Sequence, residues 1–94
     1  MYKIIYMKAD YEPWWQFEGW EEHIVSTNLY MSKAQFDIGL NEILQKFRKH
    51  YVNEVCKDNK YYAFWSEDER EFCEACDDDI QIYHGLIIEN VNET

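Results

Sequence analysis

Apolar and polar residues alternate along two stretches in the first third of the chain. In residues 2–8, Tyr2, Ile4 and Tyr6 fall on one side of an extended backbone, and the residues between them fall on the other. Residues 24–31 repeat this pattern. A period of two is typical of a strand in a sheet, so we expect β-strands over residues 2–8 and 24–31.

The clearest pattern predicts an amphipathic helix over residues 33–51. Ser32 precedes it, and Gln35 stands three residues later, which completes a capping box. Large apolar residues then follow at intervals of three and four and form one stripe: Phe36, Leu40, Ile43, Leu44, Phe47 and Tyr51. The stripe predicts that this helix packs across a sheet.

The second half of the chain is less regular. Residues 52–60 are polar and are expected to form a connection, and the aromatic residues 61–65 are expected to form a third strand. Residues 70–75 and 80–89 are expected to form a hairpin around a polar turn at residues 76–79. In that hairpin five residues share one face of the return strand: Ile80, Ile82, His84, Leu86 and Ile88.

A helix is the alternative for this last region. Ser66 would cap it, and Glu69 would complete the capping box. Apolar residues then follow at helical spacing: Phe72, Cys73, Cys76, Ile80 and Tyr83. We favour the hairpin, because the β-branched alternation after Ile80 extends further than the helical pattern.

These elements predict an α+β fold. We expect an antiparallel sheet of four to five strands with one main amphipathic helix packed on one face. The 94 residues suit a single compact domain over residues 1–94.

A loop rich in large aromatic residues separates the first two predicted strands. Pro13 and Gly19 mark residues 9–22 as a structured loop. It carries Trp14, Trp15, Phe17 and Trp20. Some of these rings must pack beneath the loop, and any ring left exposed would form a patch suited to a partner protein.

The formal net charge is −10 and it is unevenly distributed. Residues 10–22 hold five acids and no base, and residues 61–79 hold eight acids and one base, whereas residues 32–60 hold six bases and four acids. Two acidic regions therefore flank a mildly basic one. Such a surface repels nucleic acids and anionic membranes, and a basic protein surface is its natural complement. The alternative is that the charge only keeps an aromatic-rich protein soluble.

The leading interpretation is a non-enzymatic protein-binding module. Its expected partner-binding residues come from the aromatic loop and from the second acidic region: Trp14, Trp15, Phe17, Trp20, Glu18, Glu21, Asp77, Asp78 and Asp79. A nucleic-acid mimic, in which carboxylates imitate phosphates, is one alternative. The sequence assigns no catalytic residue and does not decide whether the protein is an enzyme, nor does it give the oligomeric state.

A small zinc-binding protein or metalloenzyme is the other alternative. Cys73 and Cys76 form a C-x-x-C pair, and His84 could add a third ligand to a tetrahedral zinc site. One such pair is a weak signal, and buried thiols with a hydrogen-bonded core histidine are the simpler explanation. Zinc is thus a possible cofactor only.

Cysteine usage points to a reducing compartment. Three cysteines cannot all pair within one chain, and the sequence shows no apolar segment suited to a signal peptide or a membrane span. We expect a cytoplasmic protein with free thiols.

Several strings in the chain carry a resemblance to a known family. They are Glu12-Pro13-Trp14-Trp15, Phe17-Glu18-Gly19-Trp20-Glu21, Ala63-Phe64-Trp65, and Phe72-Cys73-x-x-Cys76-Asp77-Asp78-Asp79-Ile80-Gln81-Ile82-Tyr83-His84-Gly85-Leu86. The chain resembles the domain of unknown function 1033 family, small uncharacterised proteins of Gram-positive bacteria. The resemblance covers nearly the whole chain and supports a cytoplasmic location. It implies no activity and no catalytic residue.

Overall fold

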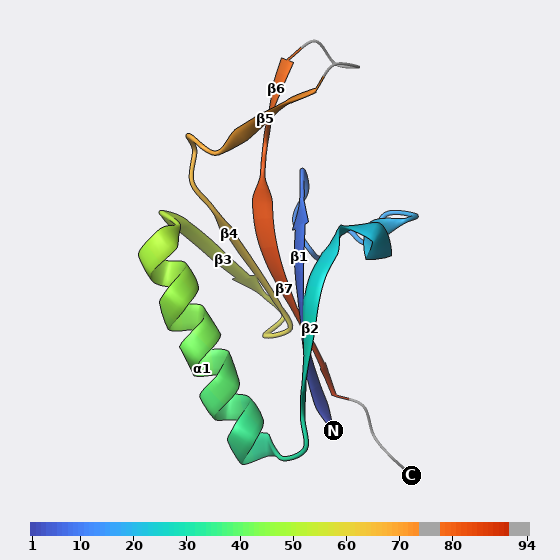
Figure 1. Cartoon of the computed structure of the whole chain (residues 1–94), viewed down its shortest axis with the longest axis vertical. Helices are drawn as coiled ribbons and strands as arrows, with labels where there is room; N and C mark the ends of the chain where they lie inside the picture. Colours follow the sequence, from blue (N-terminus) through green and yellow to red (C-terminus); the bar gives the residue numbers. More distant parts are fainter. Residues whose placement is uncertain (74–77, 91–94) are drawn as a thin grey trace.

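The computed structural model describes residues 1–73 and 78–90. For residues 72, 73, 78 and 79 it describes the backbone only. One helix lies on one side of a five-stranded antiparallel sheet, and a two-stranded sheet extends beyond the end of it (Figure 1). The predicted α+β fold, with one main helix on one face of a sheet, is confirmed. The one helix of the described residues is not long and apolar enough to cross a membrane.

The five-stranded sheet has the order β2-β1-β7-β4-β3, with every neighbouring pair antiparallel. Its strands are β1 (Tyr2–Ala9), β2 (Ile24–Tyr30), β3 (Asn53–Lys57), β4 (Tyr61–Trp65) and β7 (Tyr83–Asn90). Strand β7 is central and pairs with β1 over eight positions, from Tyr2 opposite Asn90 to Ala9 opposite Tyr83. The other elements are η1 (Trp20–His23), α1 (Lys33–His50), β5 (Arg70–Cys73) and β6 (Asp78–Gln81), of which β5 and β6 form the separate sheet.

Helix α1 covers one face of the large sheet. It begins where predicted, because the Ser32 hydroxyl accepts a hydrogen bond from the Gln35 backbone N–H at 3.2 Å. Its apolar stripe meets the inward side chains of three strands in one buried cluster: Ile4, Phe36, Leu44, Phe64 and Leu86. The predicted stripe is therefore the face that α1 buries.

The opposite face of the sheet carries a second buried cluster. Ile5, Met7, Ala9 and Ile87 form it, and side chains from the loop and η1 pack against it. No α-helix covers this face among the described residues, and the loop between β1 and η1, together with η1, takes that place (Figure 1).

Two sequence predictions about strands were wrong. Residues 53–57, expected to be part of a connection, form β3 at the edge of the sheet. Four of these five residues are exposed and only Asn53 is partly covered, so the buried–polar alternation that marks a half-buried strand is missing. The expected continuous return strand over residues 80–89 is instead divided at Ile82 into β6 and β7.

The division at Ile82 has a clear physical cause. The turn at residues 66–69 lies beside it, and the Glu69 carbonyl accepts hydrogen bonds from the Ile82 backbone N–H at 3.2 Å and from the Gln81 side-chain amide at 2.9 Å. These bonds take the place of strand pairing at that point. The hairpin itself is confirmed as β5 paired with β6, whereas the expected turn at residues 76–79 was wrong for Asp78 and Asp79, which lie in β6.

Candidate partner-binding surface

The loop between β1 and η1 is anchored by Pro13. This proline is fully buried, and it lies over Gly85 of the central strand β7. A Cβ atom built at Gly85 would come within 2.7 Å of the Pro13 Cβ atom. The close approach of the loop therefore requires a glycine at this position. The contact brings together two of the sequence strings described above, one containing Glu12-Pro13 and one containing His84-Gly85.

Two successive turns follow this anchor and determine where the aromatic rings lie. The Trp15 N–H donates to the Glu12 carbonyl at 3.3 Å, and the Trp20 N–H donates to the Phe17 carbonyl at 2.9 Å. Gly19 has a φ angle of 84°, a left-handed conformation that favours glycine. Because the chain reverses twice within a few residues, neighbouring aromatic side chains are directed differently.

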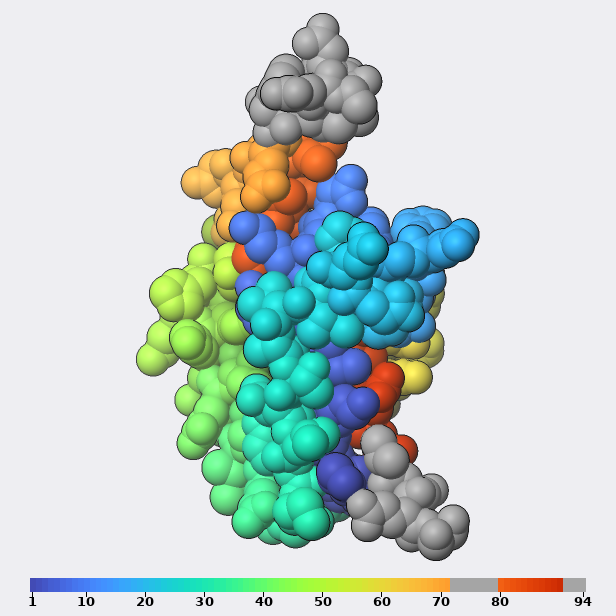
Figure 2. Space-filling model, turned by 45° about the vertical axis from the view of Figure 1, so that its right-hand side comes forward, coloured from blue at the N-terminus to red at the C-terminus, as the bar shows by residue number. Residues whose placement is uncertain are grey.

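Trp15 and Phe17 form an exposed pair, called here the aromatic platform. Each side chain is 54% exposed. Their rings are nearly parallel, with an interplanar angle of 4° and centroids 6.0 Å apart, and Tyr11 packs its ring edge-on to Phe17 at 5.0 Å. The Trp15 indole N–H donates to a Glu12 carboxylate oxygen at 2.9 Å. The platform is therefore held in place although much of its surface meets water, and the loop stands out from the molecule (Figure 2).

The other two tryptophans of the loop are less exposed. Trp14 is half-buried beneath the Lys57 ammonium group of β3, which lies 5.4 Å from its ring centroid. Trp20 is half-buried against the second core cluster. Of the four aromatic residues predicted from the loop, the structure thus presents two outward and uses two mainly for packing.

Acidic residues flank the platform along the chain. Glu18 and Glu21, predicted as partner-binding residues, are both exposed, as are Asp10 and Glu22. Charge in this loop is wholly negative, because residues 10–22 contain no lysine or arginine. Of the three predicted aspartates, Asp77 lies outside the described residues, and Asp78 and Asp79 are described only as backbone in β6.

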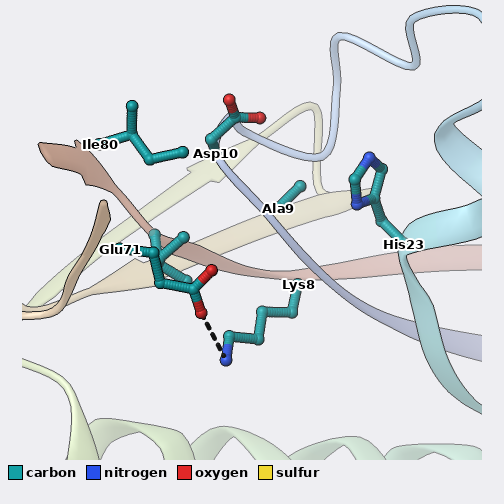
Figure 3. A pocket seen from close by; sticks show the side chains of 7 residues that line it. Lys8, Ala9, Asp10, His23, Glu71 and Ile80 are labelled. Atoms are coloured by element: carbon teal, nitrogen blue, oxygen red, sulfur yellow. Dashed lines mark ion pairs between the residues drawn. The ribbon is translucent and has the colours of Figure 1, made fainter. Parts of the chain in front are cut away.

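A hollow of about 330 Å³ lies at the end of β1, beside the loop. Figure 3 shows its lining, which is Lys8, Ala9, Asp10, His23, Glu71, Ile80 and Ile82. The Lys8 ammonium group and a Glu71 carboxylate oxygen form an ion pair across it at 3.4 Å. Tyr11 packs edge-on against both His23 and Phe17, so one ring connects the hollow with the platform.

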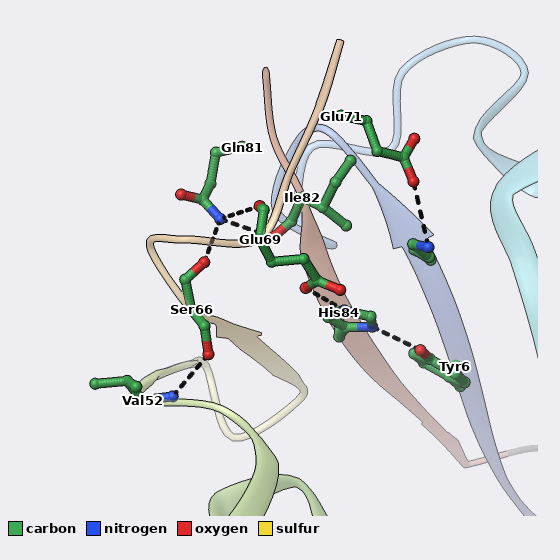
Figure 4. Close-up of polar contacts among 9 residues, drawn as sticks. Tyr6, Val52, Ser66, Glu69, Glu71, Gln81, Ile82 and His84 are labelled. Carbon is green, nitrogen blue, oxygen red and sulfur yellow. Dashed lines mark hydrogen bonds and ion pairs between the residues drawn. The ribbon is translucent and has the colours of Figure 1, made fainter. Parts of the chain in front are cut away.

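His84, considered from the sequence as a third zinc ligand, lies in the core. It is 4% exposed, and both ring nitrogens are engaged: Nδ1 lies 2.6 Å from the Tyr6 hydroxyl and Nε2 lies 2.7 Å from a Glu69 carboxylate oxygen (Figure 4). With a neutral ring, Nε2–H donates to the carboxylate and the Tyr6 O–H donates to Nδ1. This is the hydrogen-bonded core histidine that the sequence favoured over a ligand.

The contacts of His84 connect several elements of the fold, and the polar group of Tyr6, His84 and Glu69 is called here the polar lock. The Tyr51 ring stacks on the imidazole at a centroid distance of 4.3 Å. Burial, assisted by the nearby Tyr51 and Glu69 side chains, raises the pKa of Tyr6 to about 12, so its hydroxyl stays protonated and able to donate at neutral pH. The His84 side chain is closed off from solvent in this arrangement. It ties β7 to β1 and to the turn at residues 66–69.

Of the three proposed zinc ligands, only His84 has a described side chain. Cys76 lies outside it, and Cys73 is described only as backbone. His84 would have to give up Tyr6 or Glu69 to bind a metal. No group of three histidine, cysteine or acidic side chains among the described residues could hold an ion.

Sequence reasoning missed the residues that position these groups. Tyr6 and Glu69 are the partners of His84, yet they lie 78 and 15 residues from it along the chain. Gln81 was not singled out either, and its side-chain amide donates to the carbonyls of Ser66 and Glu69 at 2.8 and 2.9 Å. Buried polar side chains are hydrogen-bonded in the large majority of cases, so a core histidine implies that such partners exist, but its sequence position does not say which residues they are.

Comparison with known proteins gives one result. A family model described as "Protein of unknown function (DUF1033)" matches residues 1–94, which is the whole chain. No curated protein and no solved structure matches it. The strings quoted from the sequence have structural roles here: Pro13 packs on Gly85, and Gln81 and His84 hold the turn at residues 66–69. The chain belongs to the DUF1033 family of proteins of unknown function.

Proposed function

We propose that the protein is a non-enzymatic binding module that receives a basic segment of another protein on the aromatic platform. The observation that carries this proposal is the stacked pair of Trp15 and Phe17, each 54% exposed, in a loop whose charged residues are all acidic. Large exposed aromatic rings on a fixed backbone are typical of residues that dominate protein–protein binding.

The chemistry of the surface favours a lysine or arginine side chain as the ligand. An ammonium or guanidinium group can lie over an indole or phenyl face, where the attraction is worth about 0.5–2 kcal/mol. Glu18 and Glu21 add negative potential around the platform, which raises the local concentration of a basic partner. Fixing the two rings before binding also reduces the entropy that association would cost.

A binding titration tests the proposal. The probe is a lysine- and arginine-rich peptide, compared with a peptide of equal length in which glutamine replaces every base. We expect the basic peptide to bind and the neutral one not to, and we expect affinity to fall as salt rises. The double variant W15A/F17A should bind at least about tenfold more weakly, since loss of even one hot-spot residue costs more than about 2 kcal/mol.

Two control variants separate the platform from general changes. Ile38→Ala removes an apolar side chain of similar exposure, 63%, from α1. Glu42→Gln removes an exposed acid from the same helix, for comparison with Glu18→Gln and Glu21→Gln. Equal binding by W15A/F17A and Ile38→Ala, or binding that ignores salt, would contradict the proposal.

Capture from cell extract at low and raised salt would then identify the partner. Partners released by duplex DNA would indicate that the acids imitate phosphates, as a nucleic-acid mimic requires. Zinc analysis of protein purified without chelator tests the metal alternative through Cys73, Cys76 and His84. We place the module in the cytoplasm, because the exposed free thiol of Cys56 suits a reducing compartment.

A further inference from the structure

The two edges of the large sheet differ in their chemistry. Strand β3 is five residues long and carries Glu54 and Lys57, which are typical edge charges. Strand β2 is seven residues long and carries no charge, although 30% of the whole chain is charged. An uncharged edge strand presents unpaired backbone groups without protection against pairing with another strand.

The outer edge of β2 is open to solvent. Among the described residues β2 pairs only with β1, and residues 25–29 are all exposed. Val25 and Leu29 are 58% and 60% exposed, and they are among the most exposed large apolar side chains of the described chain. In Figure 2 the strand runs along the surface that faces the viewer, with no other segment over it. This edge is therefore accessible to a partner along its length.

The sequence of β2 is symmetric in chemistry about Thr27. Its neighbours Ser26 and Asn28 are both small and polar, and the next pair, Val25 and Leu29, are both aliphatic. The ends of the strand, Ile24 and Tyr30, are both large and apolar. When two identical strands pair antiparallel about a two-fold axis at one residue, each residue faces the one equally far on the other side.

We infer that β2 pairs antiparallel with β2 of a second copy of this chain, with the two-fold axis at Thr27. Threonine then faces threonine, which is a favourable cross-strand pair, and serine faces asparagine and valine faces leucine, so polar meets polar and aliphatic meets aliphatic. The two sheets become one continuous sheet. A second copy fits better than an unrelated strand, because only a self-pairing strand requires like residues on both sides of its centre.

The β-bulge in β2 is compatible with this pairing. The register between β1 and β2 shifts after Tyr6 opposite Ser26, and Val25 has no partner on β1. Residues Ser26–Tyr30 keep regular register with β1, so the centre of the proposed pairing is regular in both copies. The bulge lies near the end of the paired region, where Val25 is free to adjust toward Leu29 of the second copy.

The expected dimer is weak and sensitive to salt. One pair of strands buries less than the roughly 800 Å² per partner of a standard stable interface, so dilution should separate the copies. Each copy carries a net charge of −10, and the two repel one another. Raised salt screens that repulsion and should strengthen the dimer, whereas it should weaken binding of a basic partner.

Sedimentation over a range of protein concentrations tests the inference. We expect the wild-type mass to rise from one chain toward two as concentration increases, and to rise more at high salt. T27K and T27E should each stay monomeric, because like charges would face each other at the axis. An equal mixture of T27K and T27E should form a heterodimer, since opposite charges then meet. Recovery on mixing also shows that both variants are folded.

Val55→Lys is the matched control, because it adds the same charge to the opposite edge strand, where Val55 is exposed. We expect it to dimerise like the wild type, and W15A/F17A should do so as well. Wild-type protein that stays monomeric at every concentration would overturn the inference. So would a dimer that survives T27K, or a T27K and T27E mixture that stays monomeric.

Discussion

The two faces of the large sheet are covered in different ways. On one face α1 buries a regular stripe of apolar side chains against Ile4, Phe64 and Leu86. On the other face a loop without regular secondary structure packs Pro13 over Gly85, and Tyr11 and Trp20 lie against the second core cluster. The helix covers its face with a regular row of apolar contacts, whereas the loop includes a close contact between the rigid Pro13 ring and a strand glycine. The helix face is therefore expected to determine stability, and the loop face is the one free to present side chains to a partner.

The largest change in unfolding free energy is expected for a substitution on the helix face. Phe64→Ala removes a side chain with no exposure and should lower the free energy of unfolding by about 3–5 kcal/mol. Denaturant unfolding measures the change. Val52→Ala, at a strongly exposed position, is the control and should change stability little. A small loss for Phe64→Ala would show that α1 does not seal the main core.

Gly85→Ala tests the close contact between Pro13 and Gly85 on the loop face. The new methyl group would meet the rigid Pro13 ring, so the loop must move. We expect a loss of about 1–3 kcal/mol in unfolding free energy, as for other overpacked sites. Weaker binding of the basic peptide should accompany it, because the platform moves with Pro13. Full retention of both stability and peptide binding would contradict a fixed loop.

Tyr6→Phe examines the polar lock beneath the helix. It leaves Nδ1 of His84 buried without its partner, and we expect a loss of about 1–2 kcal/mol in unfolding free energy at neutral pH. Peptide binding should be unchanged, because Tyr6 lies on the helix side of the sheet. Tyr30→Phe, which keeps the ring and removes a hydroxyl near α1, is the control. Equal stability of Tyr6→Phe and wild type would show that the lock contributes nothing.

The alkaline limit of stability should depend on the same tyrosine. The pKa of Tyr6 is raised in the folded protein from 10.0 to about 12, chiefly by burial. A raised folded pKa gives stability that is complete below pH 10 and is lost as the pH rises toward 12. The unfolding free energy should therefore fall over that interval, and Tyr6→Phe should reduce the fall. Burial also raises the pKa of Tyr51 and Tyr62, so part of the fall should remain.

The smallest change in unfolding free energy is expected for a substitution of Gly39, which lies on the helix face. A Cβ atom at Gly39 of α1 would lie 2.5 Å from the end of the Tyr30 ring. That side chain can rotate away, unlike the Pro13 ring, and alanine favours the helix over glycine by about 1 kcal/mol. We expect Gly39→Ala to change the unfolding free energy by less than about 1 kcal/mol. If Gly39→Ala lowered the unfolding free energy as much as Gly85→Ala, the two faces would tolerate an added methyl group equally poorly.

The sequence predicted the elements whose burial follows a simple period. The α1 stripe, the cap at Ser32 and strands β1, β2 and β4 could all be read from it. Strand β3 could not, because its exposed residues lack alternation. The break at Ile82 could not either, since it depends on hydrogen bonds from a turn at residues 66–69. Local pattern does not report contacts between distant segments.

The candidate surface could be predicted only in outline. The loop and its aromatic residues were evident from composition, and Pro13 and Gly19 marked its turns. Which rings face outward was not, because Trp14 and Trp15 are adjacent and differ only through the backbone turn that begins at Glu12. That Pro13 rather than a tryptophan is fully buried follows from the glycine across the sheet, which no spacing in the sequence indicates.

The pairing of β1 with β7 has a consequence for how the protein is made. The second residue of the chain faces residue 90, so the middle of the sheet joins two segments from opposite ends. During translation β1 can pair with β2 early, but its other side has to wait until residues 83–90 have left the ribosome. Contacts between such distant segments slow folding. Until β7 is available, β1 carries one unpaired edge in an incomplete sheet.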